Sequence, residues 1–210
     1  MPLHVLVEES SIRPVVERVV GEVVPAVNFE ILEFPGKPNL LRLLPNRLKG
    51  YAHWPTVDPI RVLVVVDRDD DDCLILKQRL EQCAADAGLS TLSSALTGTA
   101  IVANRIVIEE LEAWFFGDKA ALRSAFPRLP AGLTDQARYR LPDSIRGGTA
   151  EALERELKRA GYPEAERRKT AIARRVAPFM SVAANTSPSF GAFVDGLRRV
   201  TSDIGGASPG

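Results

Sequence analysis

Three carboxylates directly follow apolar runs, and they are the residues of this chain best suited to chemistry. Asp67 and Asp69 follow the run at residues 62–66, and Glu8 follows the run at residues 3–7. Carboxylate oxygens are the ligands that Mg²⁺ and Mn²⁺ prefer, and such an ion polarises phosphates and acidifies water. The pattern therefore favours metal-dependent phosphoryl chemistry in which Glu8 handles a proton.

The acidic stretch at residues 67–72 also has other interpretations. Asp is a common turn former that hydrogen-bonds its own backbone, so the stretch can be a solvated turn. A calcium loop starting at Asp67 would need Gly and Glu where the chain has Asp72 and Gln78, which excludes it. A phosphatase with Asp67 as nucleophile stays a minor alternative, because the downstream Lys and acidic pair that it needs cannot be placed.

Strand and helix patterns alternate through the first half of the chain and must position these acids. The unbroken apolar run at residues 62–66 is typical of a central strand covered on both faces in a mostly parallel sheet. The patterns predict strands at residues 3–7, 27–34, 61–66 and 99–108, and helices at residues 15–23, 40–48, 76–87 and 109–117. Ligands of such sheets bind at the carboxyl ends of the strands.

If the first and third strands are neighbours, Glu8 lies about 4.8 Å across the sheet from the Asp67 and Asp69 pair. We expect Asp67 and Asp69 to point the same way, provided that the strand continues by two residues. Three converging carboxylates repel one another and raise one another's pKa, so a cation is the simplest remedy. The alternative for Glu8 is a residue that only complements the dipole of the next helix.

Only helical patterns follow residue 118. They cover residues 119–125, 149–160, 163–179 and 188–200, separated by turns that contain Pro and Gly. The predicted fold class is α/β: a Rossmann-like core at residues 1–117 with a mostly parallel sheet of about four strands, then a helical C-terminal extension at residues 118–204 packed on it. Residues 205–210 are expected to form a flexible tail. Ser187 before Pro188 is explained as a helix cap.

Further charged residues extend the predicted site. In a helix Glu109 and Glu112 share a face, so either one, rather than Glu110, is favoured as an additional metal ligand. The alternative is that all three only complement a helix dipole. Lys37 and Arg105 are candidates for holding phosphates, as is a basic helix face on which two pairs of arginines lie seven residues apart: Arg167, Arg168, Arg174 and Arg175. Arg174 and Arg175 are the favoured pair, and a solvated surface is the alternative.

Composition excludes several classes of protein. The chain carries 27 basic and 27 acidic residues, so its net charge gives no overall attraction to polyanions. No apolar stretch approaches the roughly 18 residues of a membrane span, and the N-terminus lacks signal-peptide features, so a cytoplasmic protein is expected. Cys73 and Cys83 fall on one predicted helix about 15 Å apart, which predicts free thiols. With only His4 and His53 besides, zinc is disfavoured.

Five short motifs are spread along the chain. In order, they are LVEESS, GKPNLL, VVVDRDDDDC, NRIVIEELEAWFFGD and NTSPSFGAF. An acid after strand one and Asp-x-Asp after strand three resemble the Toprim domain of topoisomerases, primases, small nucleases and the nucleases that accompany overcoming-lysogenization-defect ATPases, over residues 3–115. The five motifs together look like an uncharacterised bacterial Toprim-like family. The resemblance implies that Glu8 is the general base or acid and that Asp67 and Asp69 bind Mg²⁺ (or Mn²⁺).

The resemblance has one departure and leaves two functions open. Many Toprim domains have Gly where this chain has Glu9, and Glu removes the backbone freedom that Gly allows. No motif marks a Tyr nucleophile, so a magnesium-dependent phosphodiesterase or nuclease acting on nucleic acid, in a mobile-element or antiphage defence system, is expected rather than a topoisomerase. The alternative is a non-catalytic nucleic-acid-sensing or regulatory module that partners a separate ATPase. The absence of a Gly-rich nucleotide loop and the long helical extension favour that alternative.

Overall fold

The computed structural model describes residues 2–55, 57, 59–95 and 100–202 of the 210-residue chain. Among these residues, four parallel strands form one sheet in the order β2-β1-β3-β4. Their bounds are β1 Leu3–Val7, β2 Phe29–Glu33, β3 Arg61–Asp67 and β4 Val102–Val107. The predicted α/β class, with a mostly parallel sheet of about four strands, is confirmed.

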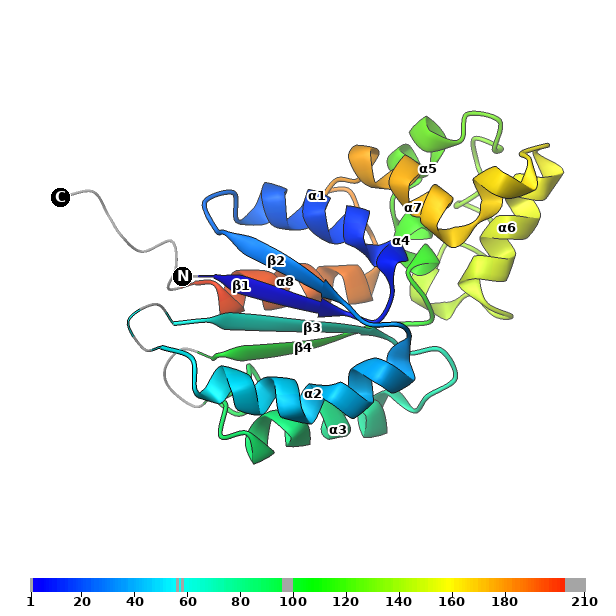
Figure 1. Ribbon diagram of the computed structural model, residues 1–210. Helices are drawn as coiled ribbons and strands as arrows, with labels where there is room; N and C mark the ends of the chain where they lie inside the picture. Colours follow the sequence, from blue (N-terminus) through cyan, green and yellow to red (C-terminus); the bar gives the residue numbers. More distant parts are fainter. Residues whose placement is uncertain (1, 56, 58, 96–99, 203–210) are drawn as a thin grey trace.

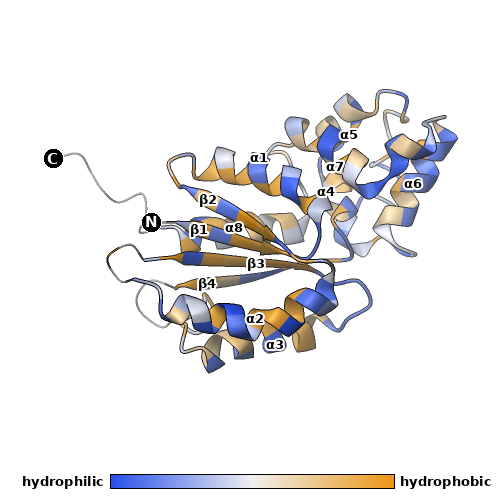
Figure 2. Cartoon of the chain, in the orientation of Figure 1, coloured by the Kyte–Doolittle hydropathy of each residue, from blue (hydrophilic) through white to orange (hydrophobic). Residues whose placement is uncertain are grey.

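Helices cover both faces of this sheet. One face carries α1 (Arg13–Val23) and α8 (Pro188–Val200), and the other carries α2 (Lys37–Ala52) and α3 (Cys73–Asp86) (Figure 1). Every residue of β3 is buried, and alternate side chains of this strand belong to the hydrophobic clusters on opposite faces. This two-sided burial explains the unbroken apolar run, which Figure 2 shows as hydrophobic along the strand.

The strand order reverses between β1 and β3. From β1 the chain crosses by α1 to β2 on one side, and from β2 it crosses by α2 over the opposite face to β3, on the other side of β1. β1 and β3 are parallel neighbours with Val7 opposite Val65, as expected. Such a switch point leaves a crevice at the carboxyl ends of the two strands, where doubly wound sheets bind their ligands.

The second half of the chain packs beyond the carboxyl ends of the strands before α8 returns to the sheet (Figure 1). Its helices are α4 Glu112–Gly117, α5 Lys119–Ala125, α6 Thr149–Arg159 and α7 Lys169–Val176. Short 3-10 helices occur at Ser10–Ile12, Pro142–Ser144, Glu164–Arg167 and Ala177–Phe179. Trp114 of α4 lies against Phe193 of α8, with ring centroids 5.0 Å apart, and both belong to the cluster that covers one sheet face. The extension thus shares a continuous core with the sheet.

Two predicted helices differ from the structure. The helix predicted at residues 163–179 is broken, because Arg168 has an extended backbone (φ −71°, ψ 140°) that separates Glu164–Arg167 from α7. The helix predicted from Glu109 begins only at Glu112, because Glu109 has a positive φ of 64°. The elements predicted at residues 3–7, 119–125 and 188–200 have the observed bounds, whereas others shift at their ends: β2 is shorter than residues 27–34, and α2 is longer than residues 40–48.

Smaller predictions resolve as follows. Cys73 and Cys83 are free thiols on α3, as predicted. Ser187 caps α8 by accepting a hydrogen bond from the backbone N–H of Phe190, with Pro188 in the first turn, which confirms that prediction too. The expected tail at residues 205–210, and Thr99 at the start of the predicted fourth strand, lie outside the described residues. No helix in the described ranges is long and apolar enough to cross a membrane.

Candidate metal centre

Three buried carboxylates from different elements lie at or near the switch point, where the charges of Glu8 and Glu112 both act on Asp67. Glu8 follows β1, Asp67 is the last residue of β3, and Glu112 is the first residue of α4. They are 8%, 4% and 1% exposed, respectively. Residues 63, 65 and 67 alternate to one face of the sheet, so Asp67 shares the face of α1 and α8 and its charge interacts with that of Glu8 and that of Glu112. Of the predicted acids, these three form the buried part of the site.

Burial makes these carboxylates hard to ionise. It raises the pKa of Asp67 well above its usual value, and the neighbouring charges of Glu8 and Glu112 raise it further. Burial likewise raises the pKa of Glu8 to about 7, with Asp69 adding to the effect, and the pKa of Glu112 to about 7. Glu8 Oε2 and both carboxylate oxygens of Glu112 are buried without a hydrogen-bond partner within the described residues. Such groups are costly to bury unless a cation or donor meets them.

The loop after β3 turns more sharply than the sequence predicted. β3 ends at Asp67, and Asp69 has a positive φ of 48°, so the expectation that Asp67 and Asp69 lie on one face of an extended strand is wrong. The Arg68 N–H donates to the Val107 carbonyl at 2.8 Å, and the Asp69 N–H donates to the Glu109 carbonyl at 3.1 Å. Each left-handed residue other than Gly costs about 1–3 kcal/mol, so strain is stored beside the acids. Among the described residues other than Gly, only Asp69 and Glu109 have a positive φ.

Lys37, the first residue of α2, points its ammonium group into this acidic loop. Nζ lies 2.7 Å from Asp69 Oδ2 and 2.8 Å from Asp71 Oδ2, and donates to the Arg68 carbonyl at 2.9 Å. Burial lowers the pKa of Lys37, but its hydrogen bonds to Asp69 and Asp71 more than offset that effect, so the pKa is raised. The residue predicted to hold phosphates is therefore already bound to carboxylates.

The three glutamates that follow β4 lie in different environments. Glu109 pairs with Arg68, and Glu110 accepts from the Ala150 N–H at 2.9 Å, at the N-terminus of α6. The prediction that Glu109 and Glu112 share a helix face is wrong, because Glu109 lies before α4 in a left-handed conformation. Of the two favoured residues, Glu112 is the one whose charge interacts with that of Asp67.

Lys169, the first residue of α7, is a site residue that the sequence did not indicate. Its Nζ lies 2.8 Å from Glu110 Oε1. Burial lowers the pKa of Lys169, but the charge of Glu112 and the hydrogen bond to Glu110 outweigh burial and raise it strongly. No local motif marks this lysine, because it joins the acids only when the extension folds onto the core.

The other predicted cations lie elsewhere. Arg105 donates to the Ala192 carbonyl of α8 at 2.6 Å and to the Asn104 carbonyl at 2.9 Å. Arg175 donates to the Ala125 carbonyl at 2.6 Å and pairs with Glu166, and Arg174 is exposed in the last turn of α7. Where the chain is described, none of these three arginines forms a hydrogen bond or ion pair with the acids of the switch point.

Asp69, Glu109 and Glu110 border an open groove of about 650 Å³, whereas Glu8, Asp67 and Glu112 are not among its lining residues. Its lining residues are Asp69, Asp70, Glu109, Glu110, Gly147, Gly148 and Glu151. Gly147 and Gly148 both have positive φ, which favours Gly at both positions of this turn before α6, and a Cβ on Gly148 would also displace the flexible end of the Glu151 side chain. The extension thus contributes bare backbone to one wall of a strongly acidic groove.

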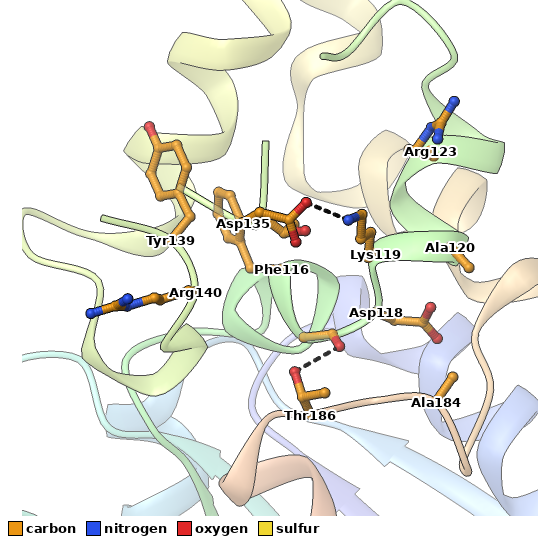
Figure 3. A pocket seen from close by; sticks show the side chains of 12 residues that line it. Phe116, Asp118, Lys119, Ala120, Arg123, Asp135, Tyr139, Arg140, Ala184 and Thr186 are labelled. Atoms are coloured by element: carbon orange, nitrogen blue, oxygen red, sulfur yellow. Dashed lines mark hydrogen bonds and ion pairs between the residues drawn. The ribbon is translucent and has the colours of Figure 1, made fainter. Parts of the chain in front are cut away.

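A second cavity, of about 690 Å³, lies within the helical extension and lacks every predicted site residue. Figure 3 shows Lys119 paired with Asp135 on one side and Thr186 bonded to the Gly117 carbonyl below. Asp118, also in its lining, caps α5 and accepts from the Ser181 N–H at 2.8 Å. This cavity contains none of the acids that follow the strands, so it is a weaker candidate for metal-dependent chemistry than the acidic groove.

The donors at the switch point fit a hard divalent cation in kind. Carboxylate oxygens suit Mg²⁺ and Mn²⁺. The oxygens of Glu8 and Glu112 that have no hydrogen-bond partner in the described structure are therefore suitable ligands for such an ion. As the side chains stand, no three His, Cys, Asp or Glu residues in the described ranges form a ready set of metal ligands. Glu9 has an ordinary extended backbone (φ −150°, ψ 161°), so this position does not require Gly.

Comparison with known families places the chain. Residues 8–198 match the family described as a domain of unknown function, DUF4276. The chain belongs to this family. The match includes Glu8, Asp67, Glu112 and both lysines of the site, so the family region contains the whole centre. Neither curated proteins nor solved structures gave a match.

Proposed function

We propose that this chain is a Mg²⁺- or Mn²⁺-dependent phosphodiesterase of the Toprim type that cleaves nucleic acid. One observation carries the proposal: the carboxylates of Glu8, Asp67 and Glu112 are buried near the strand ends where doubly wound folds bind ligands, the charges of Glu8 and Glu112 both act on Asp67, and three of their oxygens have no partner in the described structure. Such a cluster lowers the stability of the metal-free protein, and its position favours a functional explanation.

The residues divide the work by their environments. Asp67, Asp69 and Glu112 would hold the cation, which when bound supplies Lewis acidity toward a phosphate oxygen and acidifies water. Glu8 has a pKa of about 7, so it can take up and release a proton near neutral pH, as a general base or acid must. Asp69 also lines the groove of about 650 Å³, which would give a strand of nucleic acid room to approach this metal ligand.

The test uses wild-type protein, Asp67→Asn and a matched control, Asp86→Asn, which alters an exposed acid at the far end of α3. Mg²⁺ and Mn²⁺ are titrated by calorimetry, and each protein is then given labelled single- and double-stranded DNA and RNA. We expect metal binding and cleavage in wild type and in Asp86→Asn, and neither in Asp67→Asn. Unaltered cleavage by folded Asp67→Asn would refute the proposal.

The same samples test the regulatory alternative. A module that senses nucleic acid together with a separate ATPase would bind metal or nucleic acid without cutting, and would co-purify with that ATPase. Its physical support is the location of α4–α7 beyond the strand ends, where a partner docked on these helices would lie close to the groove. Cleavage by the isolated chain would count against it.

A further inference from the structure

The Lys37 ammonium group lies in a cage of three oxygens. Its distances to Asp69 Oδ2, Asp71 Oδ2 and the Arg68 carbonyl oxygen are 2.7, 2.8 and 2.9 Å, so all three of its N–H donors have acceptors. The Lys37 side chain is 12% exposed, whereas those of Asp69 and Asp71 are 49% and 51% exposed. A lysine is thus held inside an acidic loop that solvent reaches from outside.

The backbone fixes this lysine to the acidic centre. Gly36 turns the chain into α2 with a positive φ of 88°, and its N–H donates to the Glu8 carbonyl at 2.8 Å. The start of α2 is therefore tied to the segment that carries Glu8. The Lys37 charge also lowers the pKa of Glu8, although burial dominates that carboxyl.

We propose that Lys37 is a resident counter-cation of the metal centre, which must release Asp69 before a divalent cation can bind there. The inference rests on the proposed metal site. Mg²⁺ binds carboxylate oxygens at about 2.0–2.1 Å, so an ammonium group and a metal ion on the same carboxylate would repel strongly. Lys37 therefore sets the metal affinity by competition.

The side chains around Lys37 suit such an exchange. A lysine has a flexible stem and a compact charge, so it can swing away without dismantling a rigid bidentate pair, as an arginine would have to do. Lys37 can remain paired with Asp71 when it releases Asp69, because Asp71 is its second carboxylate partner. The loop then remains partly neutralised while the metal ion takes Asp69.

The test is calorimetric titration of Mg²⁺ and of Mn²⁺ into wild type and four variants. Lys37→Met and Lys37→Gln remove the competing charge, Lys37→Arg keeps it, and Lys119→Met removes a lysine that pairs with Asp135 in the extension. We expect both neutral Lys37 variants to bind metal up to about fivefold more tightly than wild type, the factor that corresponds to about 1 kcal/mol for one partly exposed ion pair. Lys37→Arg and Lys119→Met should not bind more tightly.

A second readout needs no activity. In chelator, Lys37→Met should unfold at a lower temperature than wild type, because the acids of the loop lose their counter-cation, and Mg²⁺ should raise its Tm by more than that of wild type. If wild type binds metal and neither neutral variant binds it more tightly, this inference fails and the proposed function stands. If neither wild type nor the neutral variants bind metal, both fail.

Discussion

Replacing Glu112 by Gln should stabilise the metal-free protein at pH 8 and leave its stability nearly unchanged at pH 5. Glu112 is 1% exposed, and neither of its carboxylate oxygens has a partner in the described structure. Burial raises its pKa from 4.5 to about 7. Below pH 4.5 the residue is protonated whether the chain is folded or unfolded, so it costs nothing there. Between pH 4.5 and about 7 the unfolded chain ionises while the folded residue stays protonated, so the folded protein loses stability over this window and the loss is complete above it.

The size of the effect follows from the two pKa values. The difference between 4.5 and about 7 corresponds to about 3 kcal/mol of unfolding free energy at pH 8. Gln has nearly the shape of the protonated acid and cannot ionise, so Glu112→Gln should recover that amount at pH 8. At pH 5 most of the wild-type side chain is protonated when folded, and the gain should fall below about 1 kcal/mol.

The assay is urea unfolding in the presence of chelator at pH 5 and pH 8. Glu110→Gln is the matched control two residues away. Burial tends to raise the pKa of Glu110, but its bonds to Lys169 and to the start of α6 prevail and lower it. The ionised form of Glu110 is therefore the stabilising one, and Glu110→Gln should lose stability at pH 8. The reasoning is refuted if Glu112→Gln shows the same gain at both pH values, or if both variants change stability with the same sign at pH 8.

Three further predictions concern single residues, each checked by urea unfolding. Asp72→Ala should cost about 1 kcal/mol, because the Asp72 side chain accepts two backbone N–H groups at the start of α3, whereas Asp70→Ala should stay within about 0.5 kcal/mol; equal effects would contradict the cap. Phe193→Ala should cost about 3–5 kcal/mol, since Phe193 is fully buried against Trp114; a cost under about 1 kcal/mol would show that this contact is dispensable. Gly148→Ala should cost about 1 kcal/mol or more through its positive φ and the Glu151 side chain; a neutral result would contradict the strained turn.

Most of the fold could be predicted because its signals are local. The apolar run of β3 is long and unbroken, and its two-sided burial follows from composition alone. The alternation of strand and helix then favours a parallel sheet, because each helix connects one strand to the next in the same direction. In the structure β1 and β3 are parallel neighbours, which is the condition on which the predicted proximity of Glu8 and Asp67 depended. The errors fall where backbone conformation overrides pattern: Glu109 and Arg168 look helical in sequence but adopt left-handed and extended conformations, respectively.

The site was predicted less completely, because its parts come from distant segments. Strand ends indicated Glu8 and Asp67 correctly as neighbours, since position after a strand is readable from sequence. The partners of Lys37 and the presence of Lys169 could not be read, because both depend on how helices approach the loops. Arg105 and Arg175 show the reverse error, since their charge indicated phosphate binding, whereas their guanidinium groups bond to backbone carbonyls away from the acids.

The simplest alternative for the acidic stretch, a solvated turn, explains only part of it. It holds for Asp72, which caps α3, and for Asp70, which is exposed. It does not hold for Asp67, which is 4% exposed. The separate alternative for Glu8, that it complements the dipole of the next helix, is not supported either, because Glu8 is buried and lies outside the first turn of α1. Apolar residues at these two positions would make the metal-free fold more stable. The free-energy cost of burying these carboxylates falls at the switch point of the sheet, beside two strained loops. It is therefore best explained by a ligand that offsets it.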